Sequence, residues 1–167
     1  MSVNISQTTI DAIQSMVKES FIDNSIVDRM KSVLGVDLAY NVTADLIHLN
    51  IAHYFSGHMG DGLGDLIEGH NQSVIYGGLP VQEKVYSNAT QVLEELLTLV
   101  VDYQDDLNVC AKIALDNMDT HTYMGLLKLI EDFDKIVQQC ILMVDKIHVY
   151  KDNMSFDAHI KDNFWIL

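Results

Sequence analysis

The sequence contains little proline, little cysteine and few basic residues, and each shortage narrows what the chain can be. Its single proline, Pro80, leaves long stretches on either side free to form helices of many turns. No stretch reaches about 18 uncharged apolar residues, so we expect no membrane span. The first residues, MSVNISQTT, lack a basic region followed by an apolar run. We therefore expect no secretory signal and a cytoplasmic protein.

Basic residues are heavily outnumbered by acidic ones. The chain has 10 Lys and Arg against 24 Asp and Glu, which gives a net charge of −14. Such a surface repels phosphate backbones, and residues 1–17 hold no Lys or Arg that could displace counterions from DNA. We therefore predict no nucleic-acid partner. The same charge attracts cations, although acidity alone also keeps a protein soluble.

The two cysteines, Cys110 and Cys140, are placed too far apart for a disulfide. They fall on consecutive expected helices, about 9 and 21 residues from a turn near Asp119, so an antiparallel pair offsets them by roughly 18 Å. A disulfide needs Cα atoms within about 7 Å. We expect two buried thiols that pack as small hydrophobic residues, and no zinc site.

Apolar residues recur every three or four positions through most of the chain, which predicts an all-α fold. Breaks at Asp23-Asn24-Ser25, Ser56-Gly57 and Gly77-Gly78-Leu79-Pro80 divide it. The expected elements are a short N-terminal helix over 8–22, bundle helices over 26–55, 58–76, 87–117 and 119–150, and an apolar tail over 151–167. The last two long helices form an antiparallel hairpin, and two such hairpins make a four-helix bundle. We expect one domain over 1–167, with its bundle spanning about 26–150. The apolar tail should dock on the bundle or on a neighbouring subunit, and we favour its own bundle.

Four of the seven histidines lie within 23 positions, among several carboxylates. A carboxylate and a histidine three residues apart project from one face of a helix, and a second stripe follows at offsets of 0, 3, 7 and 10. Imidazole and carboxylate ligands suit iron(II), manganese or zinc. The alternative is that these are surface residues of an acidic protein. The candidate metal ligands are Asp45 and His48 in the first set, and His58, Asp61, Asp65 and Glu68 in the second.

The order of several short motifs resembles that of the Dps-type mini-ferritins, within the ferritin-like superfamily. The motifs, which cover roughly residues 26–150, are His48-Leu49-Asn50, then His58, then Tyr76-Gly77-Gly78-Leu79-Pro80, and finally the turn from Ala114 to Asp134. The resemblance implies a ferritin-like four-helix bundle in a hollow homo-oligomer, usually of twelve subunits. In that family iron(II) binds between subunits, is oxidised there and is stored as mineral.

Carried over residue by residue, the resemblance makes His48 and His58 the histidine ligands of iron. The family's Asp-x3-Glu pair has no match, and Asp65-x2-Glu68 is the nearest substitute. A connection over 77–86, at most about 33–36 Å when extended, would have to run the length of the bundle.

Three functions remain open from the sequence. The first is a Dps-like iron-binding protein that oxidises and stores iron in an oligomeric shell, which would make it a ferroxidase. The second is a non-catalytic ferritin-fold assembly or interaction protein with a degenerate metal site. The third is a helical adaptor of an unrelated bundle family, found as a monomer or dimer without a shell.

Overall fold

The structure is a computed structural model that describes residues 5–167. Residues 1–4, which belong to the segment predicted to be no secretory signal, lie outside the described range. Every regular element in the described range is helical, which confirms the predicted all-α class. In chain order the elements are α1 (Gln7–Ser32), the π-helical η1 (Val33–Asp37), α2 (Asn41–Ile47), the π-helical η2 (His48–Ala52) and η3 (Tyr54–Gly60), α3 (Asp61–Glu68), α4 (Ala89–Asp116), α5 (Thr120–Tyr150) and α6 (Ser155–Asn163).

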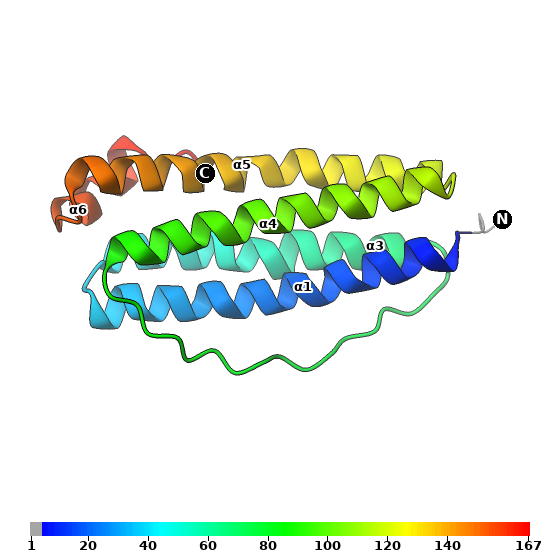
Figure 1. Ribbon diagram of the computed structural model, residues 1–167, viewed down its shortest axis with the longest axis horizontal. Coiled ribbons are helices and arrows are strands. Elements are labelled where there is room, and N and C mark those ends of the chain that lie inside the picture. The colour runs from blue at the N-terminus through cyan, green and yellow to red at the C-terminus, as the bar shows by residue number, and fades with distance from the viewer. Residues whose placement is uncertain (1–4) are drawn as a thin grey trace.

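These elements form a bundle of four long helices (Figure 1). The first is α1 with η1, and the second runs from α2 through η2 and η3 to α3. They are antiparallel to each other, as are α4 and α5, and α1 packs against α4 while α3 packs against α5. A long connection joins α3 to α4 along the outside of α1, so the second and third helices run in the same direction (Figure 1). None of the helices in residues 5–167 combines the length and apolarity that crossing a bilayer requires.

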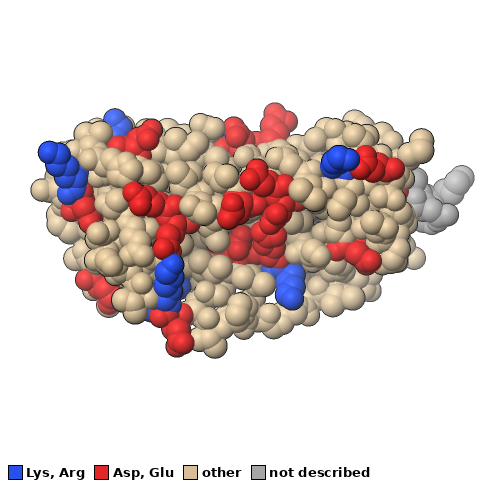
Figure 2. Space-filling model, in the orientation of Figure 1, with Lys and Arg blue, Asp and Glu red and all other residues tan. Residues whose placement is uncertain are grey.

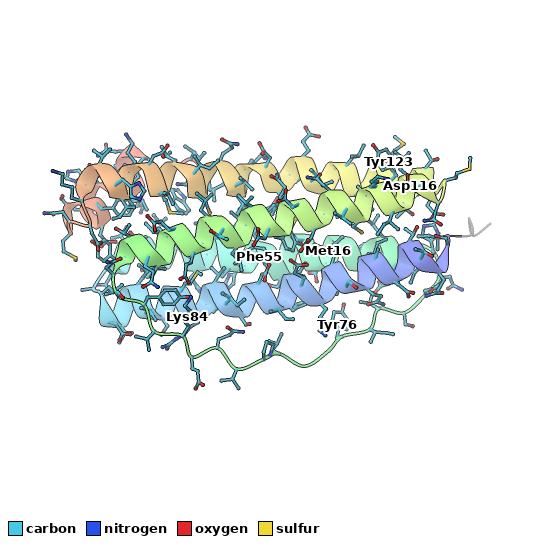
Figure 3. The ribbon with its side chains drawn as sticks, viewed as in Figure 1. Met16, Phe55, Tyr76, Lys84, Asp116 and Tyr123 are labelled. Atoms are coloured by element: carbon cyan, nitrogen blue, oxygen red, sulfur yellow. The ribbon has the colours of Figure 1, made fainter. Side chains whose placement is uncertain are left out.

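Aromatic rings fill the centre of the bundle. Phe55, Tyr103 and Phe133 come from three different helices and are fully buried. The ring centroids lie 5.0 Å apart for Phe55 and Tyr103, 4.8 Å for Tyr103 and Phe133, and 5.5 Å for Phe55 and Phe133. The remaining bundle helix, α1, contributes Ser20, whose hydroxyl oxygen lies 2.7 Å from that of Tyr103. Figure 3 shows Phe55 about halfway along the bundle, so the four helices meet there around a ring cluster.

The second hairpin has the predicted boundaries. α4 begins after Asn88, whose side chain accepts a hydrogen bond from the Gln91 backbone N–H at 2.8 Å, as expected of an N-cap. Asp119 precedes α5, but its carboxylate accepts hydrogen bonds from the Ser6 N–H and the Thr9 hydroxyl at the start of α1. The turn between α4 and α5 is thereby fastened to the N-terminal end of the first helix.

The first hairpin differs from the prediction. No separate helix forms over 8–22, because α1 continues through Asp23-Asn24-Ser25, where the Ser25 hydroxyl donates to the Ile22 carbonyl. The chain turns instead after η1, at Ala39, which has a left-handed φ of 61°. The second bundle helix therefore begins at Asn41 and runs past Ser56-Gly57 to Glu68. Asp, Asn and Ser often cap helices, but here Asp23-Asn24-Ser25 lies inside α1, because the packing of the helix outweighs the preference of these residues for helix ends.

The connection between the hairpins is longer than predicted. The second helix ends at Glu68, not near Tyr76, so residues 69–88 form the connection, which we call the crossover. Three contacts hold it to α1. The Tyr76 ring meets Phe21 edge-on at 5.6 Å, the Ile75 N–H donates to Gln14, and the Arg29 guanidinium donates to a crossover carbonyl. Residues 69–88 are therefore long enough to run the length of the bundle, which a connection over 77–86 would barely span.

The C-terminal tail docks on its own bundle, as predicted. Phe156 and Ile160 of α6 are fully buried, and Phe164 is nearly so. The Asp157 carboxylate accepts hydrogen bonds from the backbone N–H groups of Val42 and Thr43 at the start of α2, at 3.2 and 2.7 Å. This contact serves as an N-cap supplied from a distant segment.

Both cysteines are free and buried, as expected from their predicted offset. Burial raises the pKa of the Cys110 thiol to about 12 and raises the pKa of Cys140 further. Both therefore stay protonated at neutral pH and pack as small hydrophobic side chains.

Candidate metal centre

His48 lies in the first third of the second bundle helix, at the start of η2, and pairs with a carboxylate of α1. Its Nδ1 lies 3.0 Å from Asp28 Oδ1, and its ring meets that of His53 edge-on with centroids 4.3 Å apart. Asp45 is exposed on α2, and no hydrogen bond or ion pair joins it to His48 within residues 5–167. The structure thus does not bring together the first predicted ligand set.

His58 and two of its predicted companions line one surface pocket. The pocket lies between α3 and α5, has a volume of about 400 Å³, and includes His58, Asp61 and Asp65. Asp132 of α5 joins them, with its Oδ2 3.1 Å from His58 Nε2. Glu68 is exposed one turn further on and does not line this pocket, which we call the α3–α5 pocket. Three members of the second predicted set therefore line one pocket, together with a carboxylate that sequence spacing could not supply.

Glycines bring α3 and α5 close enough for this contact. A Cβ added at Gly62 would lie 2.9 Å from a methyl carbon of Leu129, and one added at Gly125 would lie 2.7 Å from a methyl carbon of Leu66. The two glycines therefore mark where α3 and α5 pack closely. The Tyr54 ring stacks on His58 at 4.5 Å and limits the positions its imidazole can take.

His48 and His58 do not share a site within one chain. They lie on the same bundle helix, in η2 and η3, ten residues and thus roughly 15 Å apart. Each is paired with a different carboxylate, Asp28 for the first and Asp132 for the second. The predicted helices over 26–55 and 58–76 place the two histidines on different helices, whereas the structure places both on one.

A second group of carboxylates, absent from the predicted ligands, lies between α1 and α4. Glu19 and Asp23 are one turn apart on α1, and Asp102 and Asp106 are one turn apart on α4. Burial, a hydrogen bond to Asp106 and repulsion from the other three raise the pKa of Glu19 to about 8. Burial and repulsion from Asp106 and Asp102 raise the pKa of Asp23 to about 7. Like charges four residues apart destabilise a helix. The pairs Glu19 and Asp23, and Asp102 and Asp106, have this spacing, which is the feature of the sequence that could have indicated the group.

In the part of the chain that the structure describes, aromatic side chains occupy the centre of the bundle. Its centre is the Phe55–Tyr103–Phe133 ring cluster, and the nearest buried polar atom is the Ser20 hydroxyl, which bonds Tyr103. Across residues 5–167, no group of three or more His, Cys, Asp or Glu side chains is arranged so that it could hold a metal ion.

Known proteins match this chain by fold and not by sequence. No family model matches it, and no curated protein does. Among solved structures it is similar to a Chlorobium tepidum ferritin, with a TM-score of 0.83 and 16% identity over 97% of this chain and 100% of that one. A ferritin from M. penetrans gives a TM-score of 0.84 at 13% identity over 94% and 95%, and an open-pore ferritin from Archaeoglobus fulgidus gives 0.86 at 11% over 95% and 98%. This chain has the ferritin fold.

Ferritin-fold bundles that carry two metal ions use a characteristic set of inward-facing ligands. A Glu comes from each of two helices, and a Glu-x-x-His motif comes from each of the other two. This sequence contains no Glu-x-x-His motif. Where four helices could have pointed such ligands at one another, this ferritin-fold bundle presents the three rings and a serine. The residues present do not fit an internal two-metal centre.

Proposed function

We propose that this protein is a subunit of a homo-oligomeric ferritin-fold shell that binds and stores iron without an oxidation centre inside its bundle. The observation that carries the proposal is the ring cluster of Phe55, Tyr103 and Phe133, which fills the bundle centre with apolar side chains. A metal ion there would have no charged ligand and would have to give up its water, which is very costly in an apolar interior.

Iron as cargo is supported by the outer surfaces. The chain carries a net charge of −14 and so attracts cations. The α3–α5 pocket offers the imidazole of His58 and the carboxylates of Asp61, Asp65 and Asp132. This mixture of nitrogen and oxygen ligands suits iron(II).

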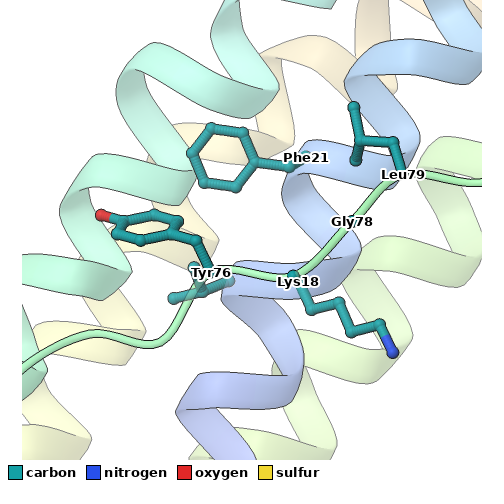
Figure 4. A pocket seen from close by; sticks show the side chains of 7 residues that line it. Lys18, Phe21, Tyr76, Gly78 and Leu79 are labelled. Carbon is teal, nitrogen blue, oxygen red and sulfur yellow. The ribbon is translucent and has the colours of Figure 1, made fainter.

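Assembly with further copies is supported by the crossover. Its apolar side chains point into solvent, with Val81 83% and Val85 80% exposed. Figure 4 shows Tyr76 and Phe21 packed together where the crossover passes α1, with Leu79 beyond them. Apolar side chains that are left in water along a segment fixed to the bundle favour contact with another protein surface.

Two measurements on the same preparation test the proposal. Native mass spectrometry or size-exclusion chromatography should give a particle many times the 18.8 kDa chain. After iron loading, iron should co-elute with this particle, while iron(II) in air should be oxidised no faster than in protein-free buffer. A monomer, or a particle that carries no iron after loading, would refute the proposal.

The α3–α5 pocket also favours a second candidate, the Dps-like function with iron(II) oxidation at a surface site and a shell of twelve subunits. Its supporting observation is His58 beside Asp132, at 3.1 Å. This candidate predicts a saturable burst of iron(II) oxidation that is lost in His58→Ala and in Asp132→Asn. It also predicts a loss in the His48→Ala, His58→Ala double variant. An exposed substitution such as Asp105→Asn should leave the burst unchanged and is the matched control.

A further inference from the structure

The last residues of the chain fold back over one end of the bundle and are held there by specific side chains. Figure 1 shows α6 crossing that end, close to where α5 stops. Beyond α6 the backbone meets Gln139 of α5, which is fully buried. Its Nε2 donates to the Phe164 carbonyl at 3.1 Å, and its Oε1 accepts from the Ile166 N–H at 2.6 Å. We call residues 154–167 the C-terminal arm, and the surface of α2 and α5 that it covers the arm groove.

The turn that leads into the C-terminal arm is strained. Lys151 and Asp152 have φ values of 52° and 55°, and the other left-handed positions in residues 5–167 are isolated single residues. Helices that end in this conformation usually place glycine there, because a Cβ makes it sterically costly. Residues 150–167 contain neither glycine nor proline, so no local preference stops α5 at this point. We call residues 151–153 the hinge.

The contacts of the C-terminal arm impose the turn at the hinge. The Tyr40 hydroxyl lies 3.0 Å from the Asp152 carbonyl oxygen and 2.9 Å from its carboxylate. The Tyr40 ring lies 6.3 Å from that of Phe156, and the Asp157 carboxylate accepts from the Thr43 N–H. Tyr40 and Thr43 both belong to the first hairpin. None of these contacts requires that the arm and the groove belong to the same chain.

Apolar side chains around the hinge are left in water. Val36 of η1 is 80% exposed, Val149 in the last turn of α5 is 72% exposed, and Met154 just after the hinge is 49% exposed. They lie at the end of the bundle where η1 leads into α2 and α5 ends. Exposed apolar residues that gather in one place favour contact with another protein surface. A second copy that approaches this end would cover them.

We propose that the C-terminal arm is exchanged between two copies of this chain, each arm filling the arm groove of the other copy. The groove of a second copy is identical, so the exchanged arm keeps the contacts that it makes with its own groove. The hinge, by contrast, is free to leave the left-handed conformation of Lys151 and Asp152 once it spans two copies. Exchange therefore preserves the favourable contacts and releases the strain. The inference does not rest on iron storage or on a shell.

A cysteine pair across the arm groove tests the exchange. The Thr43 hydroxyl lies 2.7 Å from the Asp157 carboxylate, so Thr43→Cys and Asp157→Cys place two thiols side by side. Oxidation then joins the arm to whichever groove holds it, and a denaturing gel without reductant separates single chains from joined pairs. Protein refolded from urea should contain joined pairs, in a fraction that rises with protein concentration. The unmodified protein, whose Cys110 and Cys140 are buried, should give none.

Two substitutions at the exposed Lys151, made in the same cysteine background, are matched to each other. Lys151→Gly allows the left-handed turn without strain, so it favours the arm that docks on its own chain. It should lower the fraction of joined pairs about fivefold or more. Lys151→Ala removes the same side chain and keeps the strain, so it should leave that fraction within about twofold of the value before substitution.

A second cysteine pair, Gln139→Cys with Ile166→Cys, joined by a short dithiol cross-linker, leaves the Asp157 contacts intact. This pair carries the test if the first one does not fold or does not join. Joined products of single-chain mass alone at every protein concentration, or equal fractions of joined pairs in Lys151→Gly and Lys151→Ala, would overturn the proposal. Joined pairs in a protein that forms no shell would support the exchange while refuting the proposed assembly.

Discussion

The four carboxylates of Glu19, Asp23, Asp102 and Asp106 between α1 and α4, which we call the acidic seam, should make this protein less stable as the pH rises. Figure 2 shows acidic side chains near the middle of the face that α1 and α4 form in Figure 1. Paired carboxylates have the reverse effect. Glu19 and Asp23 have pKa values of about 8 and about 7 in the folded chain, against ordinary values of 4.5 and 3.8. Between these limits the folded state holds protons that the unfolded state has released. The free energy of unfolding must therefore fall as pH rises through this window, since stability follows the difference in bound protons. It is highest near pH 4–5 and levels off above about pH 8.

The size of the effect follows from the number of protons involved. One additional proton held by the folded state changes the free energy of unfolding by about 1.4 kcal/mol per pH unit. Two such protons give an upper bound of about 5 kcal/mol between pH 5 and 7. Glu19 is half-buried and water reaches the rim of the seam, so screening reduces that figure. We expect a loss of roughly 2–3 kcal/mol over this range.

Urea unfolding at several pH values, with divalent cations removed by a chelator, measures this loss. The double variant Glu19→Gln, Asp23→Asn should flatten the slope, and it should be more stable than the unmodified protein at pH 7.5 but not at pH 4.5. Asp105→Asn, which changes one exposed charge on α4, should keep the slope. An unmodified protein whose unfolding free energy rises between pH 5 and 7, or a double variant with an unchanged slope, would refute the reasoning.

Three further substitutions test contacts elsewhere. Phe133→Ala should lower the free energy of unfolding by about 3–5 kcal/mol, because it opens a cavity in the ring cluster, and urea unfolding measures this. Asp157→Ala removes the acceptor for the Thr43 N–H and should cost about 1–3 kcal/mol, with faster amide exchange in α6 than in α5. Asn88→Ala should lower the free energy of unfolding by about 1 kcal/mol through loss of the α4 N-cap, and Asn88→Ser should restore most of it.

The second hairpin could be predicted because local and long-range signals agree there. Residues 87–117 and 119–150 were expected to be helical, and α4 and α5 occupy Ala89–Asp116 and Thr120–Tyr150. Apolar residues recur at helical spacing through both, Asn88 is a strong cap, and the turn carries polar residues. Each local preference points to the same structure as the packed bundle, which is where sequence reasoning is most reliable.

The first hairpin could not be predicted in the same way, because its true turn carries no signal. The chain reverses at Leu38-Ala39-Tyr40, where Ala39 adopts a left-handed φ of 61° without a glycine or asparagine to favour it. Conversely, Gly60 and Gly62 lie within helices, where the first faces Phe21 and the second faces Leu129. These glycines are there for close packing, and sequence alone cannot tell a packing glycine from one that ends a helix.

The positions of the predicted metal ligands could not be derived from the sequence for two reasons. Misplacing the turn put His48 and His58 on facing helices, although both lie on one. The π-helical η2 and η3 then change the angular spacing along that helix, so counting three or four residues no longer identifies one face. His58, Asp61 and Asp65 line one pocket, as their spacing suggests, because the three residues span only the end of η3 and α3. Asp132 and the acidic seam depend on contacts between helices, which spacing within one helix cannot reveal.

The ring cluster and the acidic seam have opposite consequences for a protein that meets metal ions. Inward-facing carboxylates repel one another in a dry interior unless a cation is bound. Phe55, Tyr103 and Phe133 carry no such charge, so the core of this bundle needs no metal to stay folded. The carboxylates that do repel one another lie at the seam, where water and cations can reach Asp102 and Asp106. Protonation at the seam should therefore adjust the stability of an already folded chain with pH, while the packing of its apolar core does not depend on it.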